Sequence, residues 1–353
     1  MWYLFLTVLF FFLSLSNFCE GNEYKFRPVT PEYNKELQQY CRNPQFDDDQ
    51  AERKVMHGDY VAKGKYPWAV AITYDGGSYC GGTIISPRHI ITARHCIDGI
   101  HRFTPVYVKV GGVCHSVSPS DDCPRSDMRE VAVEFAAYEP RVDADLENSN
   151  VTIKIRNMGH DMAIIQLKED LVQHFGNESA LDDTRVACLP QLTERIPDVN
   201  HVYGWGLTEK GAGSPHLMEV ELKTMNTTAD PILQNTAYQQ NVISKMCLSE
   251  RLYCMHPKEG NNNQDGAQGD SGSGIVGRRG PLAILFGSTI AGAPQGAGFI
   301  MNIASKTQAF EYDICYFTGV CTEKDWVGKT EESKLTLNYH AFFDPLKAQN
   351  VEI

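Results

Sequence analysis

Short apolar runs separated by Gly, Pro and Asp constrain the fold of this chain more than any other feature. They recur from Val55 onward, at intervals of roughly 15 to 40 residues, with no amphipathic helical pattern between them. Some alternate apolar and polar residues, as half-buried strands do, and others are continuously apolar. The pattern predicts an all-β barrel or sandwich. Examples are WAVAI (68–72), HIITA (89–93), VYVKV (106–110), MAIIQL (162–167) and FIMNI (299–303).

The first residues form a separate apolar segment. WYLFLTVLFFFLSL (2–15) has the length of a signal-peptide core, and it is shorter than the roughly 20 apolar residues that a spanning helix needs. A membrane anchor is the alternative, and the absence of a basic residue before the run is atypical of a signal peptide. We expect residues 1–21 to be a signal peptide, the mature protein to be secreted and extracellular, and no membrane association after signal cleavage.

Length and charge narrow the function classes. The 353 residues are enough for one large or two small domains, and the net charge is −12 with no block of Lys or Arg. Because such a surface repels phosphate backbones, we expect no nucleic-acid partner.

Cysteine usage fits an oxidising compartment. Cys19 lies in or beside the predicted signal peptide, which leaves an even number of cysteines, as expected of a disulfide-bonded secreted chain. The spacing matches no zinc motif, so we expect no structural metal. Three sequons, at Asn150, Asn177 and Asn226, predict N-glycosylation. The remaining cysteines are Cys41, Cys80, Cys96, Cys114, Cys123, Cys188, Cys247, Cys254, Cys315 and Cys321.

Three short motifs could together hydrolyse an amide bond. This chemistry needs a nucleophile, a base that takes its proton, and a carboxylate that orients the base. ITARHC (91–96) places His95 at the end of a strand, HDMAIIQL (160–167) places Asp161 before a buried strand, and GDSGSG (269–274) places Ser271 between glycines. Taken alone, such a His is usually a surface or core residue, and such an Asp is usually a turn residue. The combination is far more specific than any one motif.

In this combination the chain resembles the trypsin-like serine proteases of the chymotrypsin fold, over roughly residues 55–315. The resemblance implies two six-stranded antiparallel β-barrels with the site between them, a short C-terminal helix and no cofactor. It also implies that His95 is the base, Asp161 its orienting group and Ser271 the nucleophile, with the N–H groups of Gly269 and Ser271 as oxyanion hole. The landmarks are Cys80-Gly-Gly-Thr-Ile-Ile-Ser, Thr92-Ala-Arg-His-Cys96, Asp161-Met-Ala-Ile-Ile, Cys188-Leu-Pro, Gly204-Trp-Gly206 and Gly269-Asp-Ser-Gly272.

Zymogen activation is a further implication of the resemblance. Arg53-Lys54 precedes Val55, so we expect cleavage after Lys54 and an ion pair between the new Val55 amine and Asp270. Arg53-Lys54 could instead be an ordinary surface pair, and His57 stands where the family has glycine. The implied organisation is a propeptide (22–54), a protease domain (55–318) and a C-terminal tail (319–353). The implied partners are protein or peptide substrates, an activating protease and protein inhibitors.

The resemblance also implies a disulfide pattern. Cys80–Cys96 would pin the histidine loop, Cys41–Cys188 would tether the propeptide, and Cys247–Cys254 fits a family bridge. Cys114–Cys123 and Cys315–Cys321 would be local links outside the usual set. The cysteines alone allow many other connectivities.

The specificity pocket departs from the family pattern. Asp265 stands six residues before Ser271, where trypsin-like members bind Arg or Lys, and Gly298 fits an open pocket wall. Asp265-Gly266 could equally be a simple turn. Ala267 replaces a usual cysteine, and the expected partner segment has none, so this bridge is missing from both ends.

Two departures lie close to the triad. An ungapped alignment puts Phe286-Gly287-Ser288 where the family has Ser-Trp-Gly, a segment whose serine supports the catalytic aspartate. A small shift would place Ser288 in that role. Arg94 replaces a usual alanine beside His95, where its charge would disfavour the imidazolium unless it points to solvent.

Two functions from different classes therefore remain. One is an active secreted serine endopeptidase that cuts after Arg or Lys. The other is a catalytically weak or inactive homologue that acts as a binding protein. The intact triad favours the first, and the departures around it favour the second. An α/β hydrolase is excluded because the Gly-x-Ser-x-Gly elbow is absent. The divergent motifs are similar to those of nematode-type secreted proteases.

Overall fold

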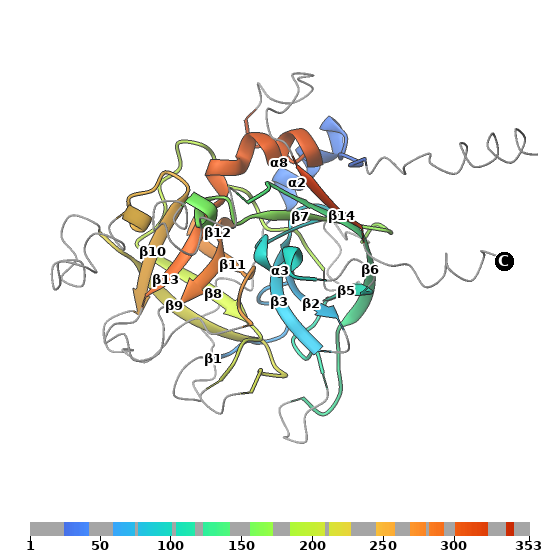
Figure 1. The fold of residues 1–353 in the computed structure, drawn as a ribbon. Coiled ribbons are helices and arrows are strands. Elements are labelled where there is room, and N and C mark those ends of the chain that lie inside the picture. The colour runs from blue at the N-terminus through green and yellow to red at the C-terminus, as the bar shows by residue number, and fades with distance from the viewer. Residues whose placement is uncertain are drawn as a thin grey trace, which may run out of the picture.

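The structure is a computed structural model, and it shows two β-barrels with their flanking segments (Figure 1). The described residues are 25–41, 59–74, 77–100, 104–116, 123–141, 156–171, 184–208, 212–226, 245–257, 269–279, 282–292, 301–323 and 337–341.

The first barrel is a closed ring of six antiparallel strands. Their order around the ring is β6-β5-β2-β3-β4-β7, and pairing of β6 with β7 closes it. The seventh strand of this sheet, β14 (Asn338–Ala341), belongs to the predicted tail and pairs with the far end of β6. The six ring strands are β2 (Ala69–Tyr74), β3 (Gly77–Ile84), β4 (His89–Thr92), β5 (Val106–Val110), β6 (Arg129–Tyr138) and β7 (Ala163–Leu167).

The second barrel has the same design. The order is β9-β10-β13-β12-β11-β8, and pairing of β9 with β8 closes the ring. A short strand that precedes the first barrel, β1 (Asp59–Tyr60), pairs with β9. The prediction of two six-stranded antiparallel barrels is confirmed. The six strands are β8 (Val199–Gly204), β9 (Met218–Thr224), β10 (Leu252–Pro257), β11 (Gly274–Arg279), β12 (Leu282–Gly292) and β13 (Asn302–Lys306).

Strand burial follows the sequence patterns. β5 alternates buried and half-buried residues, whereas all five residues of β7 are buried. The outer side of β7 is covered by the segment before the first helix. There, the Arg27 backbone N–H donates to Gln166 of β7 (2.7 Å) and the Phe26 ring meets Phe135 edge-on at 5.1 Å between centroids. A continuously apolar run therefore marks a strand with no solvent-facing side.

The two longer helices of the described chain lie before the first barrel and after the second. α2 (Pro31–Tyr40) starts at Thr30, whose side chain accepts the Tyr33 N–H, and it has proline in its first turn. The 3₁₀ turn η3 (Thr307–Phe310) leads into α8 (Glu311–Thr318), which ends at a left-handed Gly319. α8 agrees with the predicted C-terminal helix, whereas helix formation in 31–40 was not predicted.

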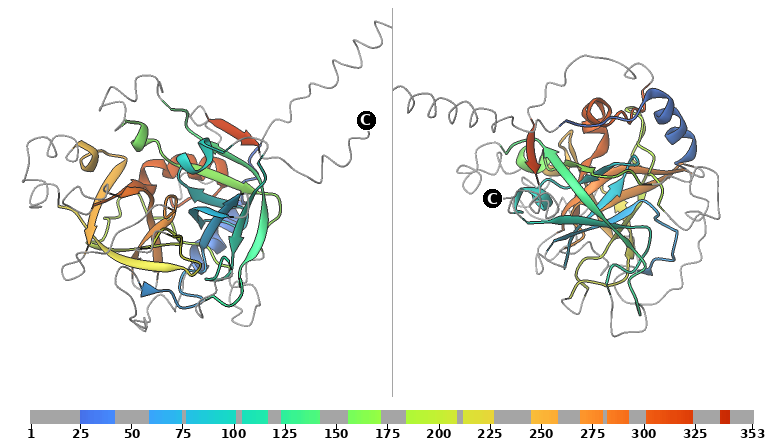
Figure 2. Two further views of the ribbon diagram at one scale, coloured as in Figure 1. Left: turned by 60° about the horizontal axis from the view of Figure 1, so that its bottom comes forward. Right: turned by 90° about the vertical axis from the view of Figure 1, so that its right-hand side faces the viewer.

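α2 and α8 lie side by side on one end of the molecule (Figures 1 and 2). The Val29 N–H donates to the last-turn carbonyl of Thr318 (2.8 Å). The Asn34 side chain exchanges hydrogen bonds with the backbone of Cys321 at 2.9 and 3.2 Å. The N-terminal segment is therefore packed into the fold rather than attached by a disulfide alone.

Five disulfides join the described parts, and they link the same pairs that the resemblance implied: Cys41–Cys188, Cys80–Cys96, Cys114–Cys123, Cys247–Cys254 and Cys315–Cys321.

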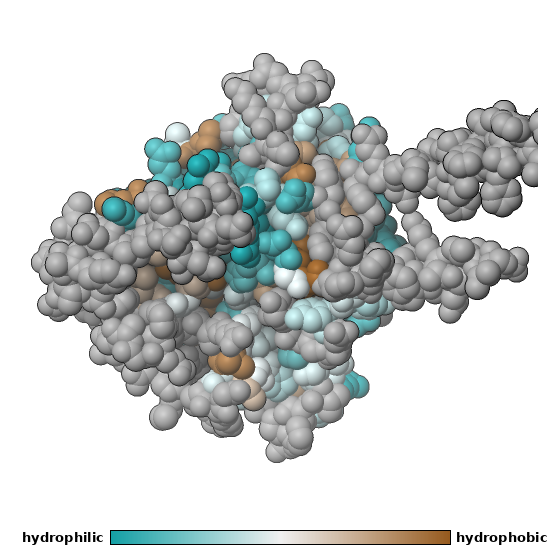
Figure 3. All heavy atoms as spheres, in the orientation of Figure 1, coloured by the Kyte–Doolittle hydropathy of each residue, from teal (hydrophilic) through white to brown (hydrophobic). Residues whose placement is uncertain are grey.

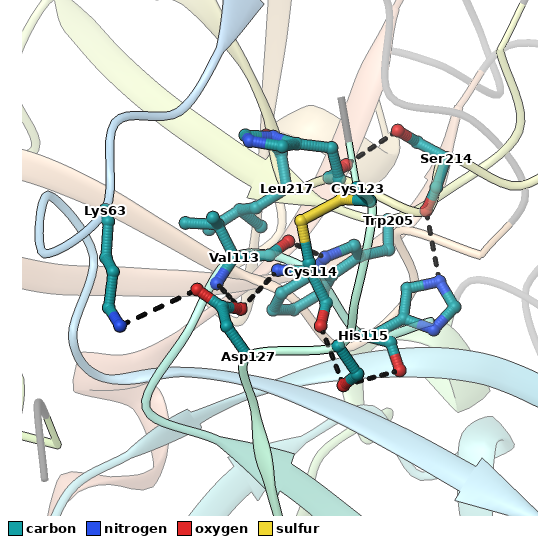
Figure 4. The surroundings of a disulfide bond; sticks show 11 residues. Lys63, Val113, Cys114, His115, Cys123, Asp127, Trp205, Ser214 and Leu217 are labelled. Atoms are coloured by element: carbon teal, nitrogen blue, oxygen red, sulfur yellow. Dashed lines mark hydrogen bonds and ion pairs between the residues drawn. A yellow bond between two sulfur atoms is a disulfide. The ribbon is translucent and has the colours of Figure 1, made fainter. Parts of the chain in front are cut away.

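The Cys114–Cys123 link stabilises a loop that reaches from the first barrel to the second (Figure 4). The Asp127 carboxylate accepts the N–H groups of Val113 (2.9 Å) and Cys114 (2.8 Å). The Val113 carbonyl in turn accepts the indole N–H of Trp205 at 2.9 Å. Trp205 lies between the two glycines that contact Asp270, so this loop supports the surroundings of the GDSG motif.

The face of the described surface seen in Figure 3 has no broad apolar area. In Figure 3 the hydrophobic areas of the visible described surface are small and separated by hydrophilic ones. Within the described residues, no helix has both the length and the apolar character needed to cross a bilayer. The large hydrophobic side chains that are exposed are scattered: Leu192, Val199, Leu207, Leu248 and Tyr316.

Candidate active site

His95 and Asp161 meet because their strands are paired neighbours. His95 opens the short helix α3 (His95–Asp98) just after β4, and Asp161 lies just before β7. The antiparallel pairing of Thr92 with Ala163 brings the end of β4 against the start of β7. The two residues are thus in contact although they are 66 positions apart in the chain.

The Asp161 carboxylate accepts two hydrogen bonds from His95. Its Oδ2 accepts from His95 Nδ1 at 2.6 Å, and its Oδ1 accepts the His95 backbone N–H at 2.8 Å. The Asp161 side chain is only 5% exposed, whereas that of His95 is 31% exposed. A buried carboxylate that fixes a partly exposed imidazole ring is the arrangement that a general base requires.

Ser271 is held against the same part of the first barrel. Its backbone carbonyl accepts the Gly81 N–H at 2.8 Å and lies 3.5 Å from the sulfur of Cys96, the residue after His95. The next residue, Gly272, donates its N–H to Thr289 of β12 at 2.8 Å. The loop that carries Ser271 is therefore tied to both barrels, and Ser271 itself remains half-buried.

The glycines of the motif are required by backbone geometry. Gly272 has φ +81°, and a Cβ there would lie 2.2 Å from the hydroxyl of Thr92 and 2.5 Å from the Gly81 carbonyl. Gly269 has φ +101°, also in the left-handed region that residues with side chains rarely adopt. A residue with a side chain at either position would strain the loop or push it away from His95.

Asp270 points away from the triad toward the second barrel. Its Oδ1 accepts the Gly206 N–H at 2.8 Å. A Cβ on Gly204 would lie 2.1 Å from that same oxygen, and one on Gly206 would lie 2.6 Å from the carboxylate. The Gly-Trp-Gly sequence is therefore needed to receive this carboxylate.

Several predicted site residues lie outside the described part of the chain. They are Lys54 and Val55 of the activation site, Asp265 and Gly298 of the pocket, and the sequons Asn150 and Asn177. The third sequon residue, Asn226, is exposed, as glycosylation requires.

The segment aligned with Ser-Trp-Gly does not lie as the ungapped comparison placed it. Phe286 is a core residue, 1% exposed, and the backbone beside the Ser271 loop is that of Thr289. The Ser288 hydroxyl is buried and forms no hydrogen bond to any described residue. Ser288 therefore does not support Asp161.

Arg94 points into the protein, toward the triad, and not into solvent. It is only 3% exposed, and its Nε lies 4.0 Å from Asp161 Oδ1 rather than in solvent. The ITARHC motif shows an unusual cation next to His95 in the sequence. Only the packing shows that the Arg94 guanidinium lies near the Asp161 carboxylate.

A polar cluster behind Asp161 was not predicted. Arg251 Nη1 lies 3.2 Å from both carboxylate oxygens of Glu139 and 3.1 Å from His160 Nδ1. Burial, with the nearby guanidinium groups of Arg251 and Arg94, lowers the pKa of His160 to about 4. His160 is therefore a neutral neighbour of the triad at physiological pH. No single sequence motif marks this cluster, because its members come from three separate segments.

Within the described residues, two groups of side chains lie close enough together to suggest metal ligation. They are Cys80, Cys96 and His95, and Cys114, Cys123 and His216. In each group the cysteines are bonded to one another, so they offer no thiolate to a metal.

Comparison with known proteins decides the family. The family model described as Trypsin matches residues 55–312, which is most of the chain. The chain belongs to the trypsin family. The match runs through both barrels and includes all three candidate triad residues.

Curated relatives of this trypsin-family chain are distant. An ovochymase of Halocynthia roretzi is 28% identical over 275 residues, which cover 74% of this chain and 15% of the relative. CLIP domain-containing serine protease B15 of Anopheles gambiae is 25% identical, with 75% of this chain and 71% of the relative covered. Serine protease grass of Drosophila melanogaster is 25% identical, with 67% and 59% covered. The family and the names of these relatives support a serine protease.

Proposed function

We propose that the protein is a secreted serine endopeptidase that is made as a zymogen. The observation that carries the proposal is the pair of hydrogen bonds from His95 to the buried Asp161, at 2.6 and 2.8 Å, next to the loop of Ser271. The disulfides support an extracellular location.

The reaction follows from the chemistry of these groups. The Ser271 hydroxyl attacks the scissile carbonyl while His95 Nε2 takes its proton, and Asp161 stabilises the imidazolium that forms. The N–H groups of Gly269 and Ser271 bind the oxyanion of the tetrahedral intermediate. His95 then gives its proton to the leaving amine, and water hydrolyses the acyl-enzyme by the same steps.

Activation and specificity are further parts of the proposal. Cleavage after Lys54 releases the Val55 amine, which pairs with Asp270 and so shapes the oxyanion loop. Asp265, with Gly298 in the opposite wall, selects substrates with Arg or Lys before the scissile bond. Asp265, Gly298, Lys54 and Val55 are proposed from the family resemblance alone.

Active-site labelling tests the proposal directly. A fluorophosphonate probe is added to the secreted zymogen, to the same protein after limited cleavage, and to a Ser271→Ala control. We expect labelling only of the form whose new N-terminus is Val55, and none of the control. A peptide library then measures the preference for Arg and Lys. No labelling despite verified cleavage after Lys54 would overturn the proposal in favour of an inactive binding homologue.

Asp270→Asn tests the activation switch separately. The substitution removes the charge that pairs with the new amine but leaves the triad side chains intact. We expect the cleaved variant to label at least tenfold more slowly than the cleaved wild type. Equal labelling rates would refute the role of Asp270 without affecting that of Ser271.

A further inference from the structure

The Asp161 carboxylate has an unusual set of neighbours. Among the described residues, His95 donates both of its hydrogen bonds, and no hydroxyl group donates to it. The third polar neighbour is Arg94, whose side chain is 4% exposed and whose Nε lies 4.0 Å from Oδ1. A guanidinium therefore lies on the side of the carboxylate that faces away from the imidazole bond.

Arg94 is held in this place from both of its ends. Its backbone directly precedes His95 and forms the N-cap of α3. Its Nη2 donates to the carbonyl of Asn157 at 3.2 Å, and Asn157 is itself buried, with 1% exposure. Because the stem and the head are both fixed inside the protein, the guanidinium cannot follow the carboxylate if the carboxylate turns.

The position of the Arg94 guanidinium affects the electrostatic surroundings of the Asp161 carboxylate. A buried carboxylate loses hydration, which disfavours its charged form, and a cation at about 4 Å favours that form strongly at low effective dielectric. The neighbouring groups do not compete for Asp161. Glu139 is paired with Arg251 at 3.2 Å and also contacts His160 Nδ1, so these groups have partners other than Asp161. Tyr138, another titratable residue near Arg94, donates to Asp98 at 3.4 Å.

We propose that Arg94 is a positioning residue of the triad, which holds the Asp161 carboxylate oriented toward His95 Nδ1. This inference rests on the proposed protease function and adds a residue to it. Arg94 does not touch the substrate or the reacting atoms. Its contact within the triad is with Asp161, so its loss affects the chemical step rather than substrate binding.

Arg94 also places a positive charge beside the triad. We expect its removal to move the acid limb of the pH dependence of kcat/KM to higher pH, because a nearby cation disfavours a second positive charge. A residue with a merely structural role would lower the amount of folded enzyme without moving this limb.

The test compares three variants of the activated full-length protein. Arg94→Met removes the charge at similar length, and Arg94→Lys restores it. Arg88→Met is the matched control, because Arg88 belongs to the same barrel but pairs with Asp170. Activity is measured per active site, titrated with the fluorophosphonate probe.

We expect Arg94→Met to lower kcat about 10- to 100-fold, with KM within about twofold of the wild type, and the acid limb to rise by about 0.5 to 1 pH unit. Arg94→Lys should recover most of kcat, and Arg88→Met should match the wild type in both readouts. The proposal is overturned if Arg94→Met keeps the wild-type kcat per titrated site and pH profile, or if Arg88→Met causes the same changes.

A second readout does not depend on activity. In a Ser271→Ala background, the proton shared by His95 Nδ1 and Asp161 gives a far-downfield NMR signal that reports on their hydrogen bond. We expect Arg94→Met to weaken or shift this signal, and Arg88→Met to leave it in place. If the wild type proves inactive but the signal responds in this way, the positioning role stands while the proposed function fails. An unchanged signal in Arg94→Met overturns the role whatever the activity of the wild type.

Discussion

Glu311 makes the stability of this fold depend on pH in an unusual direction. It lies in the first turn of α8, is 0% exposed, and neither of its carboxylate oxygens has a hydrogen-bond partner among the described residues. Burial, followed by repulsion from Glu323 and Glu194, raises its pKa from 4.5 to about 8. The folded protein therefore favours the neutral carboxylic acid at this position.

The direction and the size of the pH dependence caused by Glu311 follow from the linkage between proton binding and folding. Because the folded-state pKa lies above the unfolded value, the associated stability is fully present below pH 4.5 and is lost as the pH rises through about 8. At about 1.4 kcal/mol per pH unit, the gap between the two values sets an upper limit of about 5 kcal/mol. Water entry and local rearrangement reduce this penalty, so we expect about 2–3 kcal/mol.

Glu311→Gln isolates the effect, because glutamine has the shape of the neutral acid but does not ionise. The free energy of unfolding in urea, with disulfides intact, is measured at pH 5, 7 and 9 for the wild type, Glu311→Gln and Glu32→Gln. Glu32 is exposed in the first turn of α2 and serves as control. We expect Glu311→Gln to match the wild type at pH 5 and to exceed it by about 2–3 kcal/mol at pH 9. A constant difference across this range, or a Glu311→Gln variant that is less stable than the wild type at pH 9, would refute the reasoning.

Three other substitutions test contacts on which the fold and site depend. Gly319→Ala places a Cβ on a residue with left-handed backbone geometry, 2.3 Å from the Val29 carbonyl oxygen. It should lower the free energy of unfolding by about 2–3 kcal/mol and speed the hydrogen exchange of residues 25–41. Unchanged exchange in residues 25–41 would contradict this prediction. Gly272→Ala places a Cβ 2.2 Å from a first-barrel hydroxyl and should slow fluorophosphonate labelling about 100-fold in a protein that remains folded, whereas wild-type labelling would disprove the steric argument. Replacing both Cys41 and Cys188 by serine removes a disulfide that joins residues 147 positions apart. In the uncut chain it should lower the free energy of unfolding in urea by about 2–5 kcal/mol. A decrease below about 1 kcal/mol would contradict this prediction.

Sequence patterns predicted a structural feature correctly where the residues that determine it all lie in one short segment. The alternation in 106–110 predicts the half-buried strand β5, and the glycines around Ser271 match a loop whose backbone needs positive φ at Gly272. Turn chemistry and side-chain periodicity depend on neighbouring residues, so a single sequence carries them. The barrel architecture itself was predicted through the family resemblance, since strand runs alone also allowed a sandwich.

Other features could not be predicted because they depend on partners distant in sequence. β14 pairs with β6 across about half of the chain, and nothing in the charged tail marks its partner. The helix at 31–40 has weak apolar content, and it is stabilised by packing against α8 and by the Cys41–Cys188 bond. The ungapped alignment put Phe286 at the position of the supporting serine, and a small shift would have put Ser288 there. Neither comparison could show that Thr289 is the residue of β12 beside the Ser271 loop.

The sequence by itself determined which chemical groups this protein has available: a histidine beside a cysteine, an aspartate before a buried strand, and a serine between glycines. It also determined where the backbone can bend, since only glycine tolerates the geometry of the GDSG loop. The tertiary structure alone decided how the environment of those groups is built. Arg94 could have pointed into solvent, and Glu311 could have been an exposed helix residue. Both are buried because strands and loops distant in the chain close over them. Burial strengthens the interaction of Arg94 with Asp161 and raises the pKa of Glu311.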